Sequence, residues 1–330
     1  MKPFLPNCLY KPLLTLICIG FLHNSSFSQH LILGNEKFKI EAGLNFGPTF
    51  FLGDLGGNFG RGTTFLKDLN LEETRFMKGA FISVYPADWI GLRVAGQITY
   101  LSGKDNNITT DGNHEAYRKE RNLDFKSNVW EVYTALELFP LMMFNKYDDY
   151  NPRFKPYAFV GIGLFNFNPK GSLTSTNGTK TWHELHPLRT EGQGMAEYPS
   201  KKPYSLTQIN IPMGFGLKYE LSDRVNLATE LLYRKTFTDY IDDVSTTYIN
   251  ENYFDTYLTA PDAAIARRIH DKAVALTPAN RTAPGVQRGN ATNNDAYFST
   301  VIKIGIKLGD TYGSAEQRNA ARQTRCPHFY

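Results

Sequence analysis

The chain has 330 residues, a formal net charge of +4 at pH 7 and a mean hydropathy of −0.37. Beyond its N-terminus, no segment approaches the ~20 apolar residues that a membrane-spanning helix needs, which excludes a helical membrane protein. The charge is too small to indicate a nucleic-acid partner. Tyr, Phe and Gly are plentiful, at 19, 23 and 27 residues.

The first 28 residues have the pattern of a signal peptide. Lys2 and Lys11 flank or precede an apolar run over residues 13–22, and Ser26-Phe27-Ser28 forms a small-x-small cleavage site. The short apolar run disfavours a buried helix or an uncleaved anchor. Cleavage would remove two lysines and no acidic residue, so the charge would fall from +4 to +2. It would also leave Cys326 as the single cysteine, so no intrachain disulfide could form.

The segment 206–245 shows the clearest strand pattern in the chain. Apolar side chains occupy the odd positions of 209–221, and Asn210, Lys218 and Glu220 occupy even positions. After a turn at 222–224, the alternation resumes over 226–234. Period two is typical of a β-strand, and a long strand with one apolar and one charged face favours a membrane β-barrel.

The whole chain divides into eight such strands. They are expected at 38–50, 76–86, 90–102, 124–139, 154–167, 209–221, 226–234 and 297–309. The faces of 76–86 are poorly separated, so its register is open. The fold class is therefore all-β: an eight-stranded antiparallel up-and-down outer-membrane β-barrel over residues 29–309, followed by a periplasmic C-terminal tail at 310–330.

Loop lengths set the expected orientation of the barrel. Short periplasmic turns are predicted at 86–89, 140–153 and 222–224, and long extracellular loops at 51–75, 103–123, 168–203 and 239–296. The last loop contains a short helix over 261–273, with Pro261 in its first turn and Pro278 beyond its end, which we expect to pack over the barrel mouth. A second short helix is predicted at 315–322 in the tail.

A soluble lipocalin-like barrel is the alternative, with apolar residues inside and charges outside. In the membrane barrel, the charged faces would instead point into the lumen and form a salt-bridged plug, because eight strands leave room only for side chains. A proton or ion path is the less favoured function of these charges. The expected lumen charges are Glu41, Arg93, Glu131, Glu137, Lys218, Glu220, Glu230, Arg234, Lys303 and Lys307.

Residues that could carry chemistry are sparse. His183, Glu184 and His186 lack the spacing of a helical zinc motif. Asp239, Asp242, Asp243 and Asp255 could supply hard oxygen ligands to calcium, but capping of turns and pairing with Arg or Lys is the preferred reading. The sequence therefore predicts no enzyme, no cofactor, no metal and no small-molecule substrate.

Several segments together resemble the PorG family of Bacteroidota outer-membrane barrels, which is associated with the type IX secretion system. The resemblance rests on Phe51–Leu55 with Gly53 and Asp54, 155–163, the loop 188–194 with Thr190, Glu191, Gly192 and Gln193, the segment 238–245 with Asp239, Tyr240, Asp242 and Asp243, then Arg288-Gly289-Asn290, Asn294-Asp295 and 326–329. It covers nearly the whole mature chain. The chain departs from the family at Phe51, where Tyr is expected, at Arg189, where Gly is common, and at Tyr330, which extends the usual end.

The resemblance implies a non-enzymatic outer-membrane component of the type IX machinery. Its partners would be outer-membrane lipids and a periplasmic ring built by a lipoprotein and its partner protein. The periplasmic turns and the tail 310–330 would touch that ring. Two other functions stay open: a surface barrel whose extracellular loops bind a ligand or partner, and a lipid-modifying or proteolytic barrel.

Overall fold

The computed structural model describes residues 39–55, 73–107, 114–143, 152–175, 177–273 and 281–308. The chain divides into two units, Met1–Lys37 and Phe38–Tyr330, and the description below concerns the second. The expected signal peptide, the tail 310–330 with its helix, Cys326 and Pro278 lie outside the described residues.

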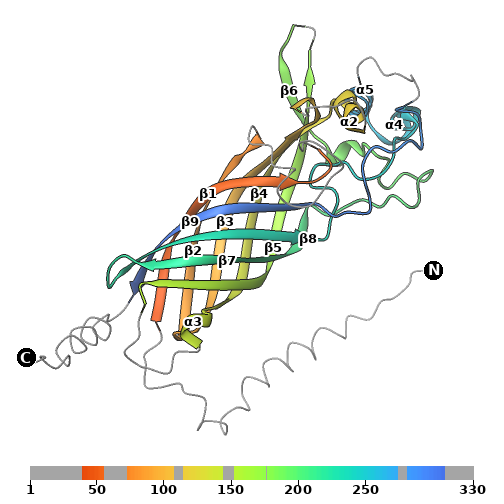
Figure 1. Ribbon diagram of the computed structural model, residues 1–330. Helices are drawn as coiled ribbons and strands as arrows, with labels where there is room; N and C mark the ends of the chain where they lie inside the picture. Colours follow the sequence, from red (N-terminus) through yellow and green to blue (C-terminus); the bar gives the residue numbers. More distant parts are fainter. Residues whose placement is uncertain are drawn as a thin grey trace, which may run out of the picture. The chain divides into compact units, whose positions relative to one another are not determined.

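One antiparallel sheet dominates the described part of the chain (Figure 1). Its strand order is β4-β3-β2-β1-β9-β8-β7-β5-β6, and a further pairing between β4 and β5 closes the first eight of these into a barrel. The prediction of an eight-stranded antiparallel barrel is thus confirmed. The strands are β1 (Lys39–Leu52), β2 (Arg75–Ala87), β3 (Ile90–Lys104), β4 (Asp124–Leu138), β5 (Phe154–Thr174), β6 (Lys180–Glu184), β7 (Thr207–Glu220), β8 (Val225–Thr236) and β9 (Ala296–Leu308).

Short helices lie in the connections, and none of those in the described residues is long and apolar enough to cross a membrane. One end of the barrel carries the short turns and α3, and we call it the short-turn end; the other, the long-loop end, carries β6, α2, α4 and α5 (Figure 1). The helices are η2 (Asp105–Asn107), α2 (His114–Arg121), α3 (Pro140–Met143), η3 (His186–Leu188), η4 (Glu251–Tyr253), α4 (Phe254–Tyr257) and α5 (Ala260–His270).

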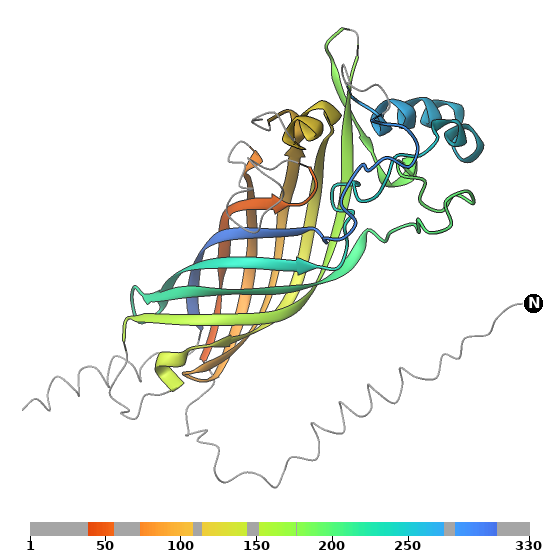
Figure 2. The same cartoon turned by 45° about the vertical axis from the view of Figure 1, so that its right-hand side comes forward.

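The largest departure from the sequence prediction lies between 168 and 203, where a single polar loop was expected. Strand β5 instead continues to Thr174, and β6 pairs with its extension from Lys170↔Glu184 to Thr174↔Lys180. This hairpin projects beyond the barrel in both views (Figure 2). A five-residue strand with polar residues at Lys180, Thr181 and Glu184 carries too little alternation to be recognised.

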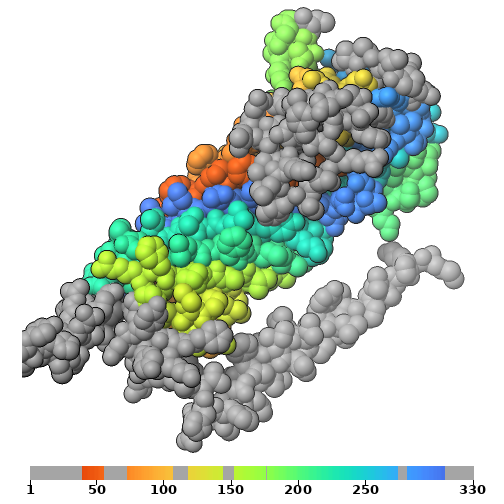
Figure 3. All heavy atoms as spheres, in the orientation of Figure 1, coloured from red at the N-terminus to blue at the C-terminus, as the bar shows by residue number. Residues whose placement is uncertain are grey.

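The two faces of every barrel strand are sharply different. Apolar side chains cover the outside, including Phe76, Ile82, Trp130, Ile162 and Phe215, each between 46% and 67% exposed. Charged and aromatic side chains fill the inside. Burying charges while exposing a continuous apolar wall suits lipid and not water, so the soluble lipocalin-like alternative is wrong (Figure 3 shows the outer wall of β7 and β8). The open register of strand 76–86 is settled in the same way: Met77 and Phe81 point inward.

Three buried apolar clusters stack along the molecule. One includes Phe81, Tyr133 and Phe159 inside the barrel, and a second includes Phe125, Phe167 and Tyr297 near the long-loop end. The third consists of Leu173 of β5 and of residues within 185–204 and 245–273, and we call these two ranges the cap. Helix α5 forms part of the cap, with Thr259 as its N-cap and Pro261 in its first turn, as predicted, but it ends at His270 rather than at 273.

Candidate functional site

The ten charged residues assigned to the lumen lie on inward-facing positions of the strands. Nine are at most 7% exposed, and the tenth, Lys307, has a side chain that is 19% exposed near the short-turn end. The strands position them because inward positions alternate with lipid-facing ones, and paired strands hold them at matching heights.

The central layer of the lumen is built around Arg93. Its Nε donates to Glu137 Oε1 at 2.5 Å, and its Nη1 and Nη2 donate to Glu230 at 3.0 and 2.6 Å. Lys303 Nζ lies 3.0 Å from Glu230 Oε1, and the hydroxyl of Tyr157 donates to the same oxygen. Two cations thus share two carboxylates, so each charge is compensated within the interior.

Further ion pairs lie in the layers on either side. Towards the long-loop end, Arg234 Nε donates to Glu131 at 3.3 Å, and Asn210 donates to the same carboxylate at 2.6 Å. Towards the short-turn end, Lys218 donates to Glu41 at 2.9 Å. The lumen is therefore filled over its length by paired charges and rings.

Sequence reasoning missed several members of this network. Lys155 donates to Glu220 Oε1 at 3.0 Å, beside the predicted Lys307, and the Tyr85 hydroxyl donates to Glu137 at 2.8 Å. Lys155 stands at the start of β5, where its inward position two residues before buried Tyr157 was the available signal. Tyr85 was hidden by the open register of its strand.

A second cluster gathers several of the loop residues that carry the family resemblance. We call Asp54, Glu191, Asp239, Asp242, Asp243, Arg288 and Asp295 the mouth cluster. Asp242 accepts from the backbone N–H of Leu55 and Val244 at 2.9 and 3.0 Å, and Asp295 accepts from Ile241 N at 2.8 Å. The bonds from Leu55 and Ile241 connect segments that are far apart in the sequence, so these carboxylates hold separate loops together.

Glu191 and Asp243 make further hydrogen bonds between these loops. Glu191 accepts from the backbone N–H of Ser245 and Thr246 at 3.0 and 2.9 Å, and from Arg288 Nη1 at 2.9 Å. Asp243 accepts from the hydroxyls of Thr190 and Tyr204 at 2.5 and 2.7 Å.

The remaining motif residues shape the backbone and the packing. Gln193 accepts from the N–H of Glu191 at 3.1 Å, the Tyr240 ring stacks on Tyr204 with centroids 4.7 Å apart, and Gly192 has a φ of +80°. At Gly53, a Cβ would come too close to Asp295 Oδ1 and the Phe51 ring, so a larger residue would have to displace these side chains. The motifs thus define the loop structure at the long-loop end.

Burial perturbs the acids of this cluster. It raises the pKa of Asp239 to about 9, with further repulsion from Asp54 and Asp242 against a hydrogen bond from Ser245. Burial also raises the pKa of Asp243 to about 6, although Arg288 and two hydroxyl donors oppose the shift. Burial and the proximity of other carboxylates both favour the neutral form of a carboxyl group.

Of the residues considered for metal binding, Asp239, Asp242 and Asp243 lie together in the mouth cluster, whereas the others have separate partners. His183 contacts Thr181 at 3.0 Å, Glu184 pairs with Lys170 at 3.1 Å, and His186 contacts the carbonyl of Tyr204 at 3.0 Å. Asp255 pairs with Arg267 on the cap. No group of three or more His, Cys, Asp or Glu among the described residues could hold a metal ion.

Comparisons with known proteins find similarity only at the level of structure. No protein-family model matches the chain, and no curated relative matches it. The attachment invasion locus protein Ail of Yersinia pestis superposes with a TM-score of 0.32 and 8% identity, over 82% of this chain and 97% of Ail. Neisserial surface protein A gives a TM-score of 0.32 and 10% identity over 82% and 97% of the two chains. A major outer membrane protein of Thermus thermophilus gives 0.34 and 10% over 83% and 100%.

Proposed function

We propose that this chain is a non-enzymatic outer-membrane barrel that anchors part of the type IX secretion machinery by contacting a periplasmic ring. The observation that carries the anchoring role is the filled lumen. Arg93, Glu137, Glu230 and Lys303 block the centre with compensated charges, which leaves an eight-stranded barrel no room for a solute path. A barrel that neither conducts nor catalyses can still fix partners to the membrane.

The secretion role rests on the resemblance to the PorG family. Its motif residues converge in the mouth cluster and define the loop structure there, as expected if the family shares this mouth. They do not form a docking surface, because the acids of the cluster are buried, except for Asp54, which is half-buried. In this proposal the partner surface lies at the periplasmic, short-turn end.

The short-turn end offers exposed apolar side chains for such a contact. Leu141 and Met143 of α3 are 49% and 59% exposed, and α3 buries none of its residues. Exposed apolar side chains at the barrel end that faces the periplasm are suited to contact with a protein partner or with the lipid interface. A ring protein that covers α3 would bury both side chains.

Deletion of the gene tests the secretion role in the organism that encodes the chain. We expect loss of export of proteins that carry type IX signals, restored by the wild-type gene. Normal export would contradict the proposal.

A pull-down in mild detergent tests the partner surface. Leu141→Ser with Met143→Ser should weaken co-purification of periplasmic ring proteins, and removal of residues 313–330 should do the same. Phe237→Ser is the matched control, because Phe237 is a similarly exposed apolar residue (52%) at the other end of the barrel. Equal recovery with all variants would place the contact elsewhere.

A further inference from the structure

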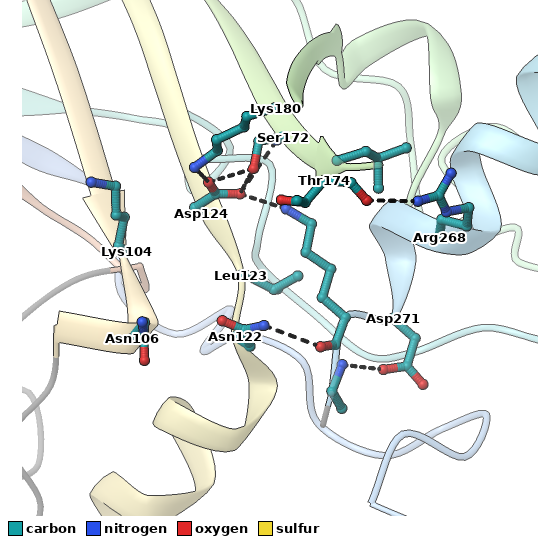
Figure 4. A pocket seen from close by; sticks show the side chains of 13 residues that line it. Lys104, Asn106, Asn122, Leu123, Asp124, Ser172, Thr174, Lys180, Arg268 and Asp271 are labelled. Carbon is teal, nitrogen blue, oxygen red and sulfur yellow. Dashed lines mark hydrogen bonds and ion pairs between the residues drawn. The ribbon is translucent and has the colours of Figure 1, made fainter. Parts of the chain in front are cut away.

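A cavity of about 460 Å³ lies on the outer wall of the barrel, at the long-loop end (Figure 4). We call it the outer-wall pocket. Strands β3, β4, β5 and β6 supply one side, and the end of α5 supplies the other. Its lining includes Lys104, Asp124, Ser172, Lys180, Arg268 and Lys272.

The polar strand residues of the pocket lie on the lipid-facing side of the wall, while the buried side chains of Leu123 and Leu173 also line it. Asp124 is an even-numbered position of β4, on the same face as the exposed Trp130, and Phe125 points inward. By the same alternation, Lys104 shares a face with the exposed Tyr100 on β3.

The height of the pocket above the apolar belt follows from strand geometry. Asp124 precedes Trp130, the last exposed apolar residue of β4 on this side, by six positions, or roughly 20 Å along a strand that rises ~3.3 Å per residue. A tilt of ~40° reduces this to roughly 15 Å along the membrane normal. The head groups of ordinary phospholipids extend only ~5–8 Å beyond the hydrocarbon. The pocket therefore lies at the level of a larger, sugar-bearing head group.

The chemistry of the lining favours an anionic ligand. Three cationic side chains, Lys180, Arg268 and Lys272, line the pocket together with two carboxylates, Asp124 and Asp271. A fourth cation, Lys104, pairs with Glu73 at 2.9 Å. Asp124 is 2.7 Å from Lys180 and 2.5 Å from Lys272, so it holds both ammonium groups in place. Arg268 donates to the carbonyl of Thr174 at 3.1 Å and has no carboxylate partner within the described ranges. Its fork of donors suits a phosphate group.

An aromatic side chain adjoins these cations. The Trp182 ring of β6 has Lys126 Nζ at 4.1 Å and Lys180 Nζ at 4.8 Å from its centroid. Asn106 and Asn122 add amide groups to the polar lining, which also suits sugar hydroxyls.

We propose that the outer-wall pocket binds the phosphorylated sugar head group of a glycolipid in the outer leaflet, with Arg268 and Lys180 on the phosphate. The inference relies on the membrane orientation proposed above but not on the secretion role. Binding is measured on the purified full chain, so its failure leaves the secretion proposal intact.

The test uses the fluorescence of Trp182 in a background with Trp89→Phe and Trp130→Phe, since the chain has three tryptophans. The probe is a diphosphorylated glucosamine lipid in phospholipid nanodiscs. A phosphate that draws Lys180 away from the ring should give a saturable change in emission. No change, or an equal change with the dephosphorylated lipid, would overturn the proposal. Glucosamine 6-phosphate that binds as tightly as the lipid would overturn the glycolipid as the source.

Two substitutions shift the affinity in opposite directions. Arg268→Gln should weaken binding about tenfold, the loss expected for one charged hydrogen-bonding group. Asp124→Asn should tighten binding, because it frees Lys180 and Lys272 for the phosphate. Lys235→Gln is the matched control, since Lys235 is an exposed lysine at the long-loop end of β8. A loss of affinity equal to that of Arg268→Gln in the control, or none in either, would contradict the site.

Discussion

Glu230 is the residue whose loss should most clearly expose the paired lumen. Its carboxylate accepts two hydrogen bonds from Arg93 and one from Tyr157, and it lies 3.0 Å from Lys303 Nζ. The change Glu230→Gln keeps the shape of the side chain and removes its charge. Removal of one partner from a buried ion pair costs about 3–5 kcal/mol. Because Glu137 stays 2.5 Å from Arg93 and 3.6 Å from Lys303, we expect the lower end, about 3 kcal/mol.

The assay is urea unfolding of the barrel in lipid vesicles, followed by tryptophan fluorescence and by heat-modifiable mobility on gels. Asp88→Asn is the control, because Asp88 pairs with Lys39 at the surface and its loss should cost about 1 kcal/mol or less. Lys303→Met combined with Glu230→Gln restores the charge balance, so the double variant should be less destabilised than the sum of the single changes, by about 0.5–3 kcal/mol. Unfolding of Glu230→Gln within about 0.5 kcal/mol of wild type would refute the reasoning.

Three further predictions test other parts of the structure. Val160→Arg, midway along the lipid-facing side of β5, should lower the unfolding free energy in vesicles by about 2–4 kcal/mol, and an unchanged value would argue that this face does not meet lipid. In the folded state Asp239 keeps its proton up to its pKa of about 9, whereas in the unfolded state it loses the proton near pH 4. The free energy of unfolding should therefore fall as pH rises between these values. Asp239→Asn should make the free energy of unfolding less dependent on pH, as measured by unfolding at several pH values. Arg189 has a φ of +51°, so Arg189→Gly should raise the unfolding free energy by up to about 1 kcal/mol, whereas a loss of stability would show that the Arg189 side chain outweighs the strain.

Much of the barrel could be read from alternation, because a strand that separates two environments must alternate. The inward and outward faces of β1, β4, β7 and β9 agree with the pattern seen in the sequence. The pattern could not say which face meets lipid, since the same alternation serves a soluble barrel with its faces exchanged. The burial of charged side chains such as Arg93 and the exposure of apolar ones such as Ile162 decide which face meets lipid.

The long-loop end was less predictable, because its structure depends on contacts between distant segments. Asp54 accepts from Asn290 N, and Glu191 pairs with Arg288, in each case across about a hundred residues or more. Periodicity carries no information about such pairs. The outer-wall pocket was not predictable for the same reason, since α5 and β5 are far apart in the sequence and meet only in the folded chain. At Arg189, by contrast, where the family that the sequence resembles commonly has Gly, the backbone is left-handed.

Conductance across a planar lipid bilayer tests the central claim most directly, namely that this barrel is sealed and acts as an anchor. With the lumen filled by the pairs of Arg93, Glu131, Glu137 and Glu230, the inserted wild-type protein should give no stepwise current at neutral pH. Stable, reproducible current steps from the wild-type protein would contradict a sealed lumen and the anchoring role built on it.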